Sequence, residues 1–215
     1  LELYASKTSE EIVSQQTFSF EDRGGRKVTL RPEMTPTVSR MVAARRQELG
    51  YPLRLFSIPN CFRYERMQRG RTREFWQLNV DLFGVAGIEG ELEIAQVMDR
   101  TLKAFGATPD MYEIRVNSRK SLNAMIEAAK PKQDVNSVLR VVDAIDKLST
   151  EEFALKLCEV LEDPNSLIEA LNNNQPNEEL DILIQKADKL GIKLKYSPEL
   201  ARGFDYYTDI VFEAY

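Results

Sequence analysis

Residues 62–84, FRYERMQRGRTREFWQLNVDLFG, predict two strands joined by an arginine-rich loop. The first strand begins further back, in LRLFSIPNCFRYE (53–65), and the second occupies EFWQLNVDLFGV (74–85). Side chains alternate between the two faces of a strand. In the second strand, one face therefore carries Trp76, Leu78, Val80 and Leu82, and the other carries Phe75, Gln77, Asn79 and Asp81. A solvated surface hairpin would also explain the loop, but the polar face of the second strand favours a binding site.

The loop is cationic although the whole chain is acidic. Residues 60–73 contain five arginines and one glutamate, whereas the 215 residues carry a net charge of −5. Arginine offers planar, permanently charged donors that match phosphate in a bidentate way. A local cationic loop in an acidic protein predicts a specific anionic ligand and not a general polyanion surface.

Composition excludes several classes of chemistry. The chain is 43% hydrophobic and 29% charged, as expected for a soluble protein with a real core, and it contains no histidine. Nucleophile systems that need a histidine base and histidine-ligated metal sites are thereby excluded. Two distant cysteines predict neither a disulfide framework nor a zinc site. With no transmembrane stretch or signal peptide in the sequence, we expect a reduced, cytoplasmic setting.

The segments around this hairpin predict an α+β domain. Before it, QQTFSFEDRGGRKVTLRP (15–32) predicts a hairpin that turns at DRGGR, and MTPTVSRMVAARRQELG (34–50) predicts a helix. Thr35 would cap that helix, Pro36 would lie in its first turn and Gly50 just past its end. After it we expect, in order, a helix at 88–106, a strand at 111–117, helices separated by loops at 130–134, 162–165 and 172–177, and strands at 192–197 and near the end of the chain.

Two further stretches carry candidate ligand-binding groups. In TLRPEMTP (29–36), Glu33 and Thr35 lie where a strand meets a helix and could bind a ligand ammonium, although acids and threonine are also common helix caps. In ARGFDYYTDIVFEAY (201–215), Arg202 precedes a glycine, and Tyr206 and Tyr207 point to opposite faces of a strand. Tyrosines packed at the edge of a core would also explain that pair, and for tyrosines this is the commoner case.

Together, these three stretches, in this order and with a helical insertion before the third, resemble the histidyl-tRNA synthetase family of class II aminoacyl-tRNA synthetases. RGFDYYT resembles the histidine-specific signature, and FRYER…REFWQ resembles class II motif 2. The resemblance covers essentially the whole chain. It implies an antiparallel class II sheet flanked by helices, with the first part of the catalytic core at 1–118, a helical insertion domain at 119–196 and a return strand at 197–215.

The resemblance implies a two-step reaction, in which histidine and ATP give histidyl-adenylate and pyrophosphate and the acyl group then passes to tRNA(His). ATP would be a substrate accompanied by Mg²⁺, with no tightly bound cofactor. The full-length protein would be a cytoplasmic homodimer that does not bind membranes.

The resemblance also implies residue roles. Arg63 and Arg202 would be catalytic, acting on the α-phosphate from two sides. ATP would contact Arg63, Glu65, Arg71 and Phe75, the last by stacking on adenine. Histidine would contact Glu33, Met34, Thr35, Arg63, Gln77, Asp81, Arg202, Tyr206 and Tyr207. Imidazole offers one donor and one acceptor, which a carboxylate such as Asp81 and a tyrosine hydroxyl can pair.

Parts of the family pattern are not found in these residues. Nothing here matches motif 1, motif 3 or the anticodon-binding domain, so we expect a truncated core with weak or no activity alone. An alternative is the synthetase-like regulatory subunit of ATP phosphoribosyltransferase in histidine biosynthesis, which does not charge tRNA. Those paralogues tend to lose the signature arginine and the motif 2 residues. Retention of Arg63, Gln77, Arg202 and Tyr207 therefore favours the enzyme.

Overall fold

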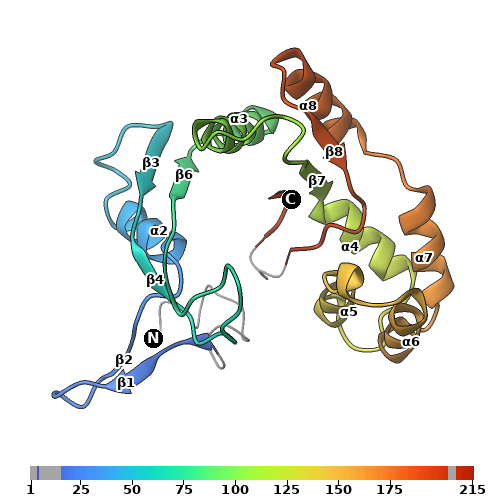
Figure 1. The fold of residues 1–215 in the computed structure, drawn as a ribbon, viewed down its shortest axis with the longest axis horizontal. Coiled ribbons are helices and arrows are strands. Elements are labelled where there is room, and N and C mark those ends of the chain that lie inside the picture. Colours follow the sequence, from blue (N-terminus) through green and yellow to red (C-terminus); the bar gives the residue numbers. More distant parts are fainter. Residues whose placement is uncertain (1–3, 5–15, 203–206) are drawn as a thin grey trace. The chain divides into compact units, whose positions relative to one another are not determined.

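A computed structural model describes Tyr4, residues 16–202 and residues 207–215. The chain forms two compact units, Leu1–Ala86 and Gly87–Tyr215 (Figure 1). No helix in the described part of the chain is long and apolar enough to cross a membrane.

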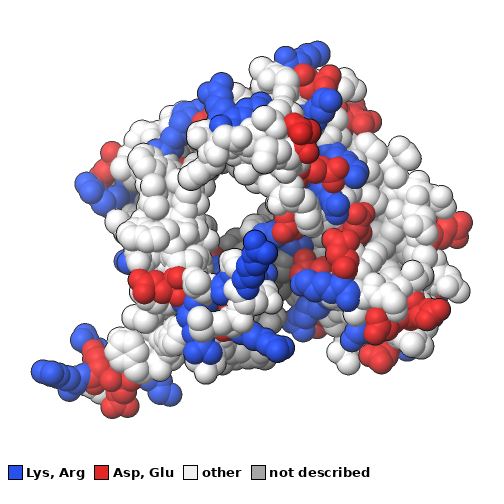
Figure 2. Space-filling model, in the orientation of Figure 1, with Lys and Arg blue, Asp and Glu red and all other residues white. Residues whose placement is uncertain are grey.

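The first unit contains the predicted short hairpin, in which β1 (Ser19–Glu21) pairs antiparallel with β2 (Lys27–Thr29). Asp22 holds the turn, because its Oδ1 accepts hydrogen bonds from the backbone N–H groups of Gly24 (2.8 Å) and Arg26 (3.0 Å). The Arg26 guanidinium also forms an ion pair with Asp22 at 2.7 Å. Both signs of charge therefore gather at the hairpin tip, at the lower left of Figure 2.

The two long strands predicted at 53–65 and 74–85 are each divided in two. β3 (Leu53–Ser57) pairs antiparallel with β6 (Asn79–Phe83), and β4 (Asn60–Phe62) pairs antiparallel with β5 (Glu74–Trp76). Pro59 lies at the first break, because proline has no N–H to donate to a ladder. The N–H of Gln77 donates to the Pro59 carbonyl at 3.1 Å. The break between β3 and β4 therefore lies opposite the break between β5 and β6.

One face of this paired region is apolar and open to solvent in the described residues. Trp76 is 70% exposed, Phe56 74%, Ile58 55% and Leu78 46%. The predicted alternation places Trp76 and Leu78 on the opposite face from Asn79 and Asp81. The side chains of Asn79 and Asp81 point toward the start of the helix that precedes β3 in the chain.

That helix, α2 (Thr35–Ala44), corrects two expectations. Its N-cap is Met34, whose side chain makes no cap hydrogen bond, so the prediction that Thr35 caps the helix is wrong. The Thr35 hydroxyl bonds to β6 instead. The helix also ends well before Gly50, where the N–H of Arg45 turns back to the Val42 carbonyl at 3.1 Å. Pro36 lies in the first turn as predicted, and Val38 and Val42 are buried.

The second unit is built on a three-stranded sheet. β7 (Ile114–Ser118) lies in the middle, parallel to β8 (Leu194–Tyr196) and antiparallel to β9 (Ile210–Ala214). α3 (Ile88–Ala104) and α8 (Glu178–Lys189) pack with the sheet around a core that includes Leu92, Ala95, Ile114, Val116, Leu180, Leu183 and Ala187.

The remaining helices form a block with its own core. They are α4 (Arg119–Ala128), α5 (Val135–Val142), the 3-10 turn Ile145–Lys147, α6 (Thr150–Val160) and α7 (Pro164–Asn173). The predicted helical block also included α8, which packs with the sheet instead. Ser118, Asp134, Ser149 and Asp163 each cap one helix through a side-chain oxygen, and Ser149 and Glu152 form a full capping box. Leu122, Ile126, Val138, Leu157 and Leu167 are fully buried in the core that these helices enclose. The predicted succession of strands, helical block and strands is confirmed.

Candidate functional site

A polar cluster forms where α2 begins. The Thr35 hydroxyl lies 3.1 Å from Oδ1 of Asn79 and 3.4 Å from Oδ1 of Asp81. The Asn79 amide donates to the other Asp81 oxygen, Oδ2, at 2.5 Å. Asn79 and Asp81 reach the same helix end because residues two apart share one face of a strand.

Asp81 is held in an environment that disfavours its charge. Burial raises the pKa of this carboxyl, and the hydrogen bonds from Thr35 and Asn79 offset only part of that increase. Asn79 was not among the predicted site residues, although it shares the predicted polar face with Asp81. Its two-residue spacing from Asp81 was the signal that would have identified it.

The segment just before α2 is buried. Glu33 is only 4% exposed. The Tyr4 hydroxyl donates to the Glu33 carbonyl at 3.4 Å and lies 3.2 Å from Oγ1 of Thr37. Met34, which follows Glu33 and is the N-cap residue of α2, is partly buried.

Arg63 is anchored to this same segment. Its Nε donates to the Pro32 carbonyl at 2.9 Å, and its backbone N–H donates to the Arg73 carbonyl at 3.0 Å. The guanidinium carbon lies 5.4 Å from the centre of the Phe75 ring, a cation–π geometry. The structure therefore places the Arg63 guanidinium between the Pro32 carbonyl, just before Glu33, and the Phe75 ring.

Gln77 has a different neighbour. Its Oε1 lies 3.6 Å from the thiol of Cys61, a residue of β4 that is completely buried. Burial raises the pKa of the Cys61 thiol, so the group stays neutral and can donate its weak S–H. No sequence signal pointed to this contact, because a lone cysteine in a strand carries none.

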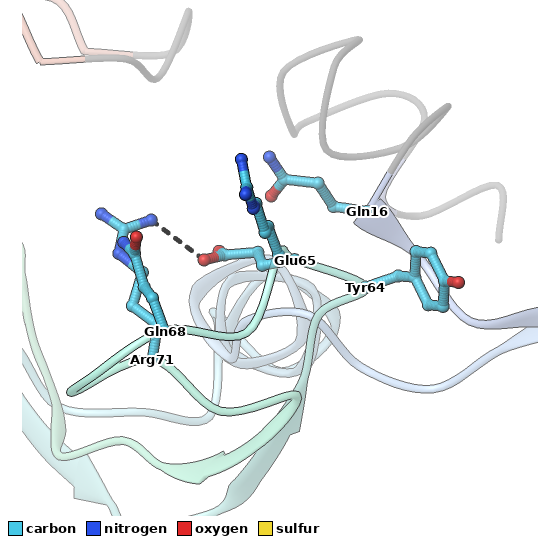
Figure 3. A pocket seen from close by; sticks show the side chains of 6 residues that line it. Gln16, Tyr64, Glu65, Gln68 and Arg71 are labelled. Atoms are coloured by element: carbon cyan, nitrogen blue, oxygen red, sulfur yellow. Dashed lines mark hydrogen bonds and ion pairs between the residues drawn. The ribbon is translucent and has the colours of Figure 1, made fainter.

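The arginine-rich loop encloses a pocket of about 300 Å³ lined by Gln16, Tyr64, Glu65, Arg66, Gln68 and Arg71. Figure 3 shows Glu65 and Arg71 joined across it, with the Arg71 Nη1 donating to Oε2 of Glu65 at 2.9 Å. Tyr64 forms one wall. The Arg73 guanidinium lies over its ring at 3.9 Å, and the rings of Tyr64 and Phe18 make a T-shaped contact with their centres 5.4 Å apart. The pocket is thus polar, cationic overall and partly neutralised by Glu65.

The signature stretch belongs to the second unit. Arg202 has a φ of 56°, and its Nη1 forms an ion pair with Oε1 of Glu213 at 2.5 Å. Burial is the largest single effect on Arg202 and lowers its pKa, but the charge and hydrogen bond of Glu213 and the nearby Tyr207 and Asp143 together outweigh burial. The pKa of Arg202 is therefore raised, and the guanidinium stays charged. Tyr207 is partly buried, and the predicted Tyr206 lies outside the described residues.

Within the first unit, Thr35 and Asp81 meet at the start of α2, which Glu33 and Met34 directly precede. Arg63 contacts the Pro32 carbonyl just before this segment, with Phe75 beside its guanidinium. Glu65 and Arg71 line the loop pocket. Arg202 and Tyr207 lie in the second unit. Among the residues that the structure describes, no group of three or more Cys, Asp and Glu side chains is arranged to hold a metal ion.

Comparisons with known proteins give a consistent result. A family model described as histidyl-tRNA synthetase matches residues 1–215. The chain is 36% identical to a histidine–tRNA ligase of Leptospira biflexa, over all of this chain and 54% of that protein. The chain thus spans about half the length of the curated relatives it matches.

Solved structures share the fold. One from Bacillus halodurans, described as an ATP phosphoribosyltransferase regulatory subunit/histidyl-tRNA synthetase, has a TM-score of 0.79 at 24% identity, over 96% of this chain and 59% of its own. Histidyl-tRNA synthetase from Nostoc sp. has a TM-score of 0.75 at 17% identity, over 99% of this chain and 58% of its own. Because both sequence identities are below 25%, these two similarities show a shared fold and nothing more.

Proposed function

Because the chain belongs to the histidyl-tRNA synthetase family, we propose that the protein containing it activates L-histidine with ATP and transfers histidine to tRNA(His). The observation that carries the proposal is the convergence at the start of α2, where Asp81 is oriented by Thr35 and Arg63 is fixed to the Pro32 carbonyl. The Asp81 carboxylate therefore contacts Thr35, the first residue of α2, and the Arg63 guanidinium contacts Pro32, three residues earlier in the chain.

The first chemical step is an in-line displacement. A carboxylate oxygen of histidine attacks the α-phosphorus of ATP, the bond from that phosphorus to the bridging oxygen breaks, and pyrophosphate leaves with its electron pair. In the second step, a ribose hydroxyl of the terminal adenosine attacks the carbonyl carbon and AMP leaves. Negative charge grows at the α-phosphate in the first transition state, so fixed cations lower its energy. Arg63 and Arg202 have this role in the proposal.

The remaining roles follow the chemistry of each group. Glu65 and Arg71 contact ATP, and Phe75, already held beneath the Arg63 guanidinium, stacks on adenine. Glu33, Thr35 and Gln77 bind the histidine ammonium, and Met34 also contacts the histidine. Asp81 accepts the imidazole N–H, and Tyr207, with Tyr206, pairs the other ring nitrogen. Such a pocket rejects apolar analogues because its polar groups would remain unpaired.

The wider assignments belong to the same proposal. Mg²⁺ accompanies ATP as part of the substrate, and the full-length protein is a cytoplasmic homodimer. The domain limits remain those expected from the sequence, with the insertion at 119–196. We expect the isolated 215 residues to show weak or no exchange activity, and wild-type turnover by them would contradict that expectation.

The second candidate function is a regulatory subunit of ATP phosphoribosyltransferase, which the description of the Bacillus halodurans structure brings into consideration. Retention of Arg63, Gln77, Arg202 and Tyr207 supports the enzyme. A regulatory subunit would bind histidine without forming an adenylate, so the two functions differ in a measurable reaction.

The test is histidine-dependent exchange of pyrophosphate into ATP by the full-length protein. We expect exchange with histidine alone among the amino acids, and a loss of about 100- to 1000-fold in Arg202→Ala, as for removal of one preorganised donor. Arg140→Ala, a solvent-exposed arginine of the same unit, is the matched control and should leave the rate unchanged. Exchange stimulated equally by another amino acid, or undiminished in Arg202→Ala, would contradict the proposal. Histidine binding without exchange would favour the regulatory subunit.

A further inference from the structure

The backbone that leads into Arg202 is held by two buried side chains from the end of β7 and the start of α4. Asn117, fully buried, donates through Nδ2 to the carbonyls of Pro198 (2.8 Å) and Leu200 (3.0 Å). Arg119, 3% exposed, donates through Nη1 to the carbonyls of Ala201 (2.5 Å) and Arg202 (2.9 Å). Four side-chain-to-backbone hydrogen bonds, to the carbonyls of residues 198, 200, 201 and 202, thus hold the segment 198–202.

These bonds maintain an unfavourable conformation. Arg202 has a φ of 56°, which residues other than glycine seldom adopt. Such strain persists only where the surroundings over-determine the backbone, and it is concentrated at functional sites. The backbone N–H of Arg119 also donates to the Asp209 carbonyl at 2.8 Å, so one residue holds both sides of the signature segment.

The guanidinium of Arg202 has its own support on β9. Its Nη1 meets Oε1 of Glu213 at 2.5 Å, and the other oxygen of that carboxylate, Oε2, accepts a hydrogen bond from the Tyr215 hydroxyl at 3.1 Å. Glu213 lies in a strand paired with β7, opposite Arg115. The Arg115 guanidinium lies 4.1 Å from the centre of the Tyr215 ring, which keeps that tyrosine in place. Both carboxylate oxygens of Glu213 are therefore engaged, on a strand that pairs with the middle strand of the sheet.

We propose that Glu213 is a positioning residue for Arg202, fixing the plane of the guanidinium that acts on the α-phosphate; this inference rests on the proposed function. A guanidinium carries five N–H donors, so an ion pair through Nη1 orients the group without using all of them. An arginine held in one orientation before the substrate arrives does not need to reorganise as charge develops in the transition state. The contribution of Glu213 therefore belongs to the chemical step more than to binding.

The experiment compares Glu213→Gln with the unsubstituted full-length protein in histidine-dependent pyrophosphate exchange. We expect kcat to fall about tenfold while KM for ATP changes less than about threefold, the pattern of an interaction that matters in the transition state. Glu89→Gln is the matched control. Glu89 also forms an ion pair with a cation of the same unit, Lys186, but that pair involves neither Arg202 nor Arg115, so exchange should be unchanged.

A second comparison separates positioning from a general structural role. In an Arg202→Gln background, adding Glu213→Gln should change the residual exchange less than about twofold, because Glu213 acts through the guanidinium that is already absent. A merely structural glutamate would lower exchange equally in both backgrounds. If Glu213→Gln does not fold, as judged by its thermal transition, Glu213→Asp replaces it, with a smaller fall in kcat expected from the shortened reach.

The outcomes distinguish this inference from the proposed function. Normal exchange in the unsubstituted protein together with an unaffected Glu213→Gln would overturn the inference alone. Equal losses in the two backgrounds would also overturn it. Absence of histidine-dependent exchange in the unsubstituted protein would overturn the proposed function and this role with it.

Discussion

The Thr35 hydroxyl lies 3.4 Å from Oδ1 of Asp81, although the two residues are 46 positions apart in the sequence. A hydroxyl that could have capped its own helix is instead directed across to a strand. Together with the bond from Asn79, it fixes both oxygens of a carboxylate that burial would otherwise tend to neutralise. This orientation makes Asp81 suited to accept one defined N–H from a ligand.

Removing the Asp81 charge should weaken histidine binding. In Asp81→Asn, we expect KM for histidine in the exchange reaction to rise about 10- to 100-fold, the worth of a hydrogen bond to a charged group. Asp22→Asn, which removes a carboxylate from the β1–β2 turn, should leave this constant unchanged. An unchanged KM in Asp81→Asn would mean that Asp81 does not read the imidazole.

The same substitution should have a characteristic pH dependence of stability. The pKa of Asp81 is raised on folding, so its contribution is fully present below the ordinary value of 3.8 and is lost as pH rises through the folded-state pKa. Asp81→Asn has no such loss. We therefore expect the thermal midpoint of Asp81→Asn to rise relative to that of the unsubstituted protein as the pH increases above 3.8. A difference that stays constant with pH would contradict the raised pKa.

Tyr112 supports a buried carboxylate in the second unit. Its hydroxyl donates to Oδ1 of Asp99 at 2.6 Å, and Lys103 pairs with the other oxygen at 2.8 Å. Asp99 is 5% exposed, so Tyr112→Phe should destabilise the fold by about 1 kcal/mol at neutral pH. Tyr51→Phe, at a ring that is 46% exposed, is the control.

The Tyr112 bond also predicts an alkaline effect. The hydrogen bond to Asp99 is the main cause that raises the pKa of Tyr112 from 10.0 to about 12. Its stabilising contribution is present below pH 10.0 and is lost as the pH approaches 12. The difference in thermal midpoint between the unsubstituted protein and Tyr112→Phe should therefore shrink over this interval. A difference that persists unchanged would show that the bond does not form.

Gly84 tests the packing at the end of β6. Its φ is +80°, and a Cβ at this position would lie 2.7 Å from Cδ1 of Tyr51 and 3.1 Å from Cβ of that residue. Gly106 has a φ of +89° with nothing within 4 Å of such a Cβ. We expect Gly106→Ala to cost about 1 kcal/mol from backbone strain, and Gly84→Ala to cost about 1–3 kcal/mol more from overpacking. Equal losses on thermal denaturation would exclude the steric contribution.

Local patterns in the sequence predicted most of the elements. Alternating faces, capping residues and turn glycines depend on neighbours within a few positions, which explains why the β1–β2 hairpin and the helical block were found. The limits of α2 and the break at Pro59 were missed. Thr35 does not act as a cap because a partner on β6 takes its hydroxyl, and such a partner is not visible in the local sequence.

The candidate site was predicted from motifs, and its supporting residues were not. Asn79, Cys61, Arg119 and Glu213 act through contacts whose partners lie elsewhere in the fold. Arg119 reaches carbonyls 82 and 83 residues away, and backbone acceptors leave no trace in the side-chain sequence. A buried cation whose partners are carbonyls can be recognised only once the chain is folded.

The apolar face opposite Asp81 provides an optical reporter. Trp76 is the single tryptophan of these 215 residues and is 70% exposed. In the isolated chain its fluorescence should therefore lie at the long-wavelength end of the range and be readily quenched by a collisional quencher such as acrylamide. Any segment or subunit that covers this face would shift the emission to shorter wavelength and shield it from the quencher. Burial of this face can thus be followed at one side chain without attaching a label.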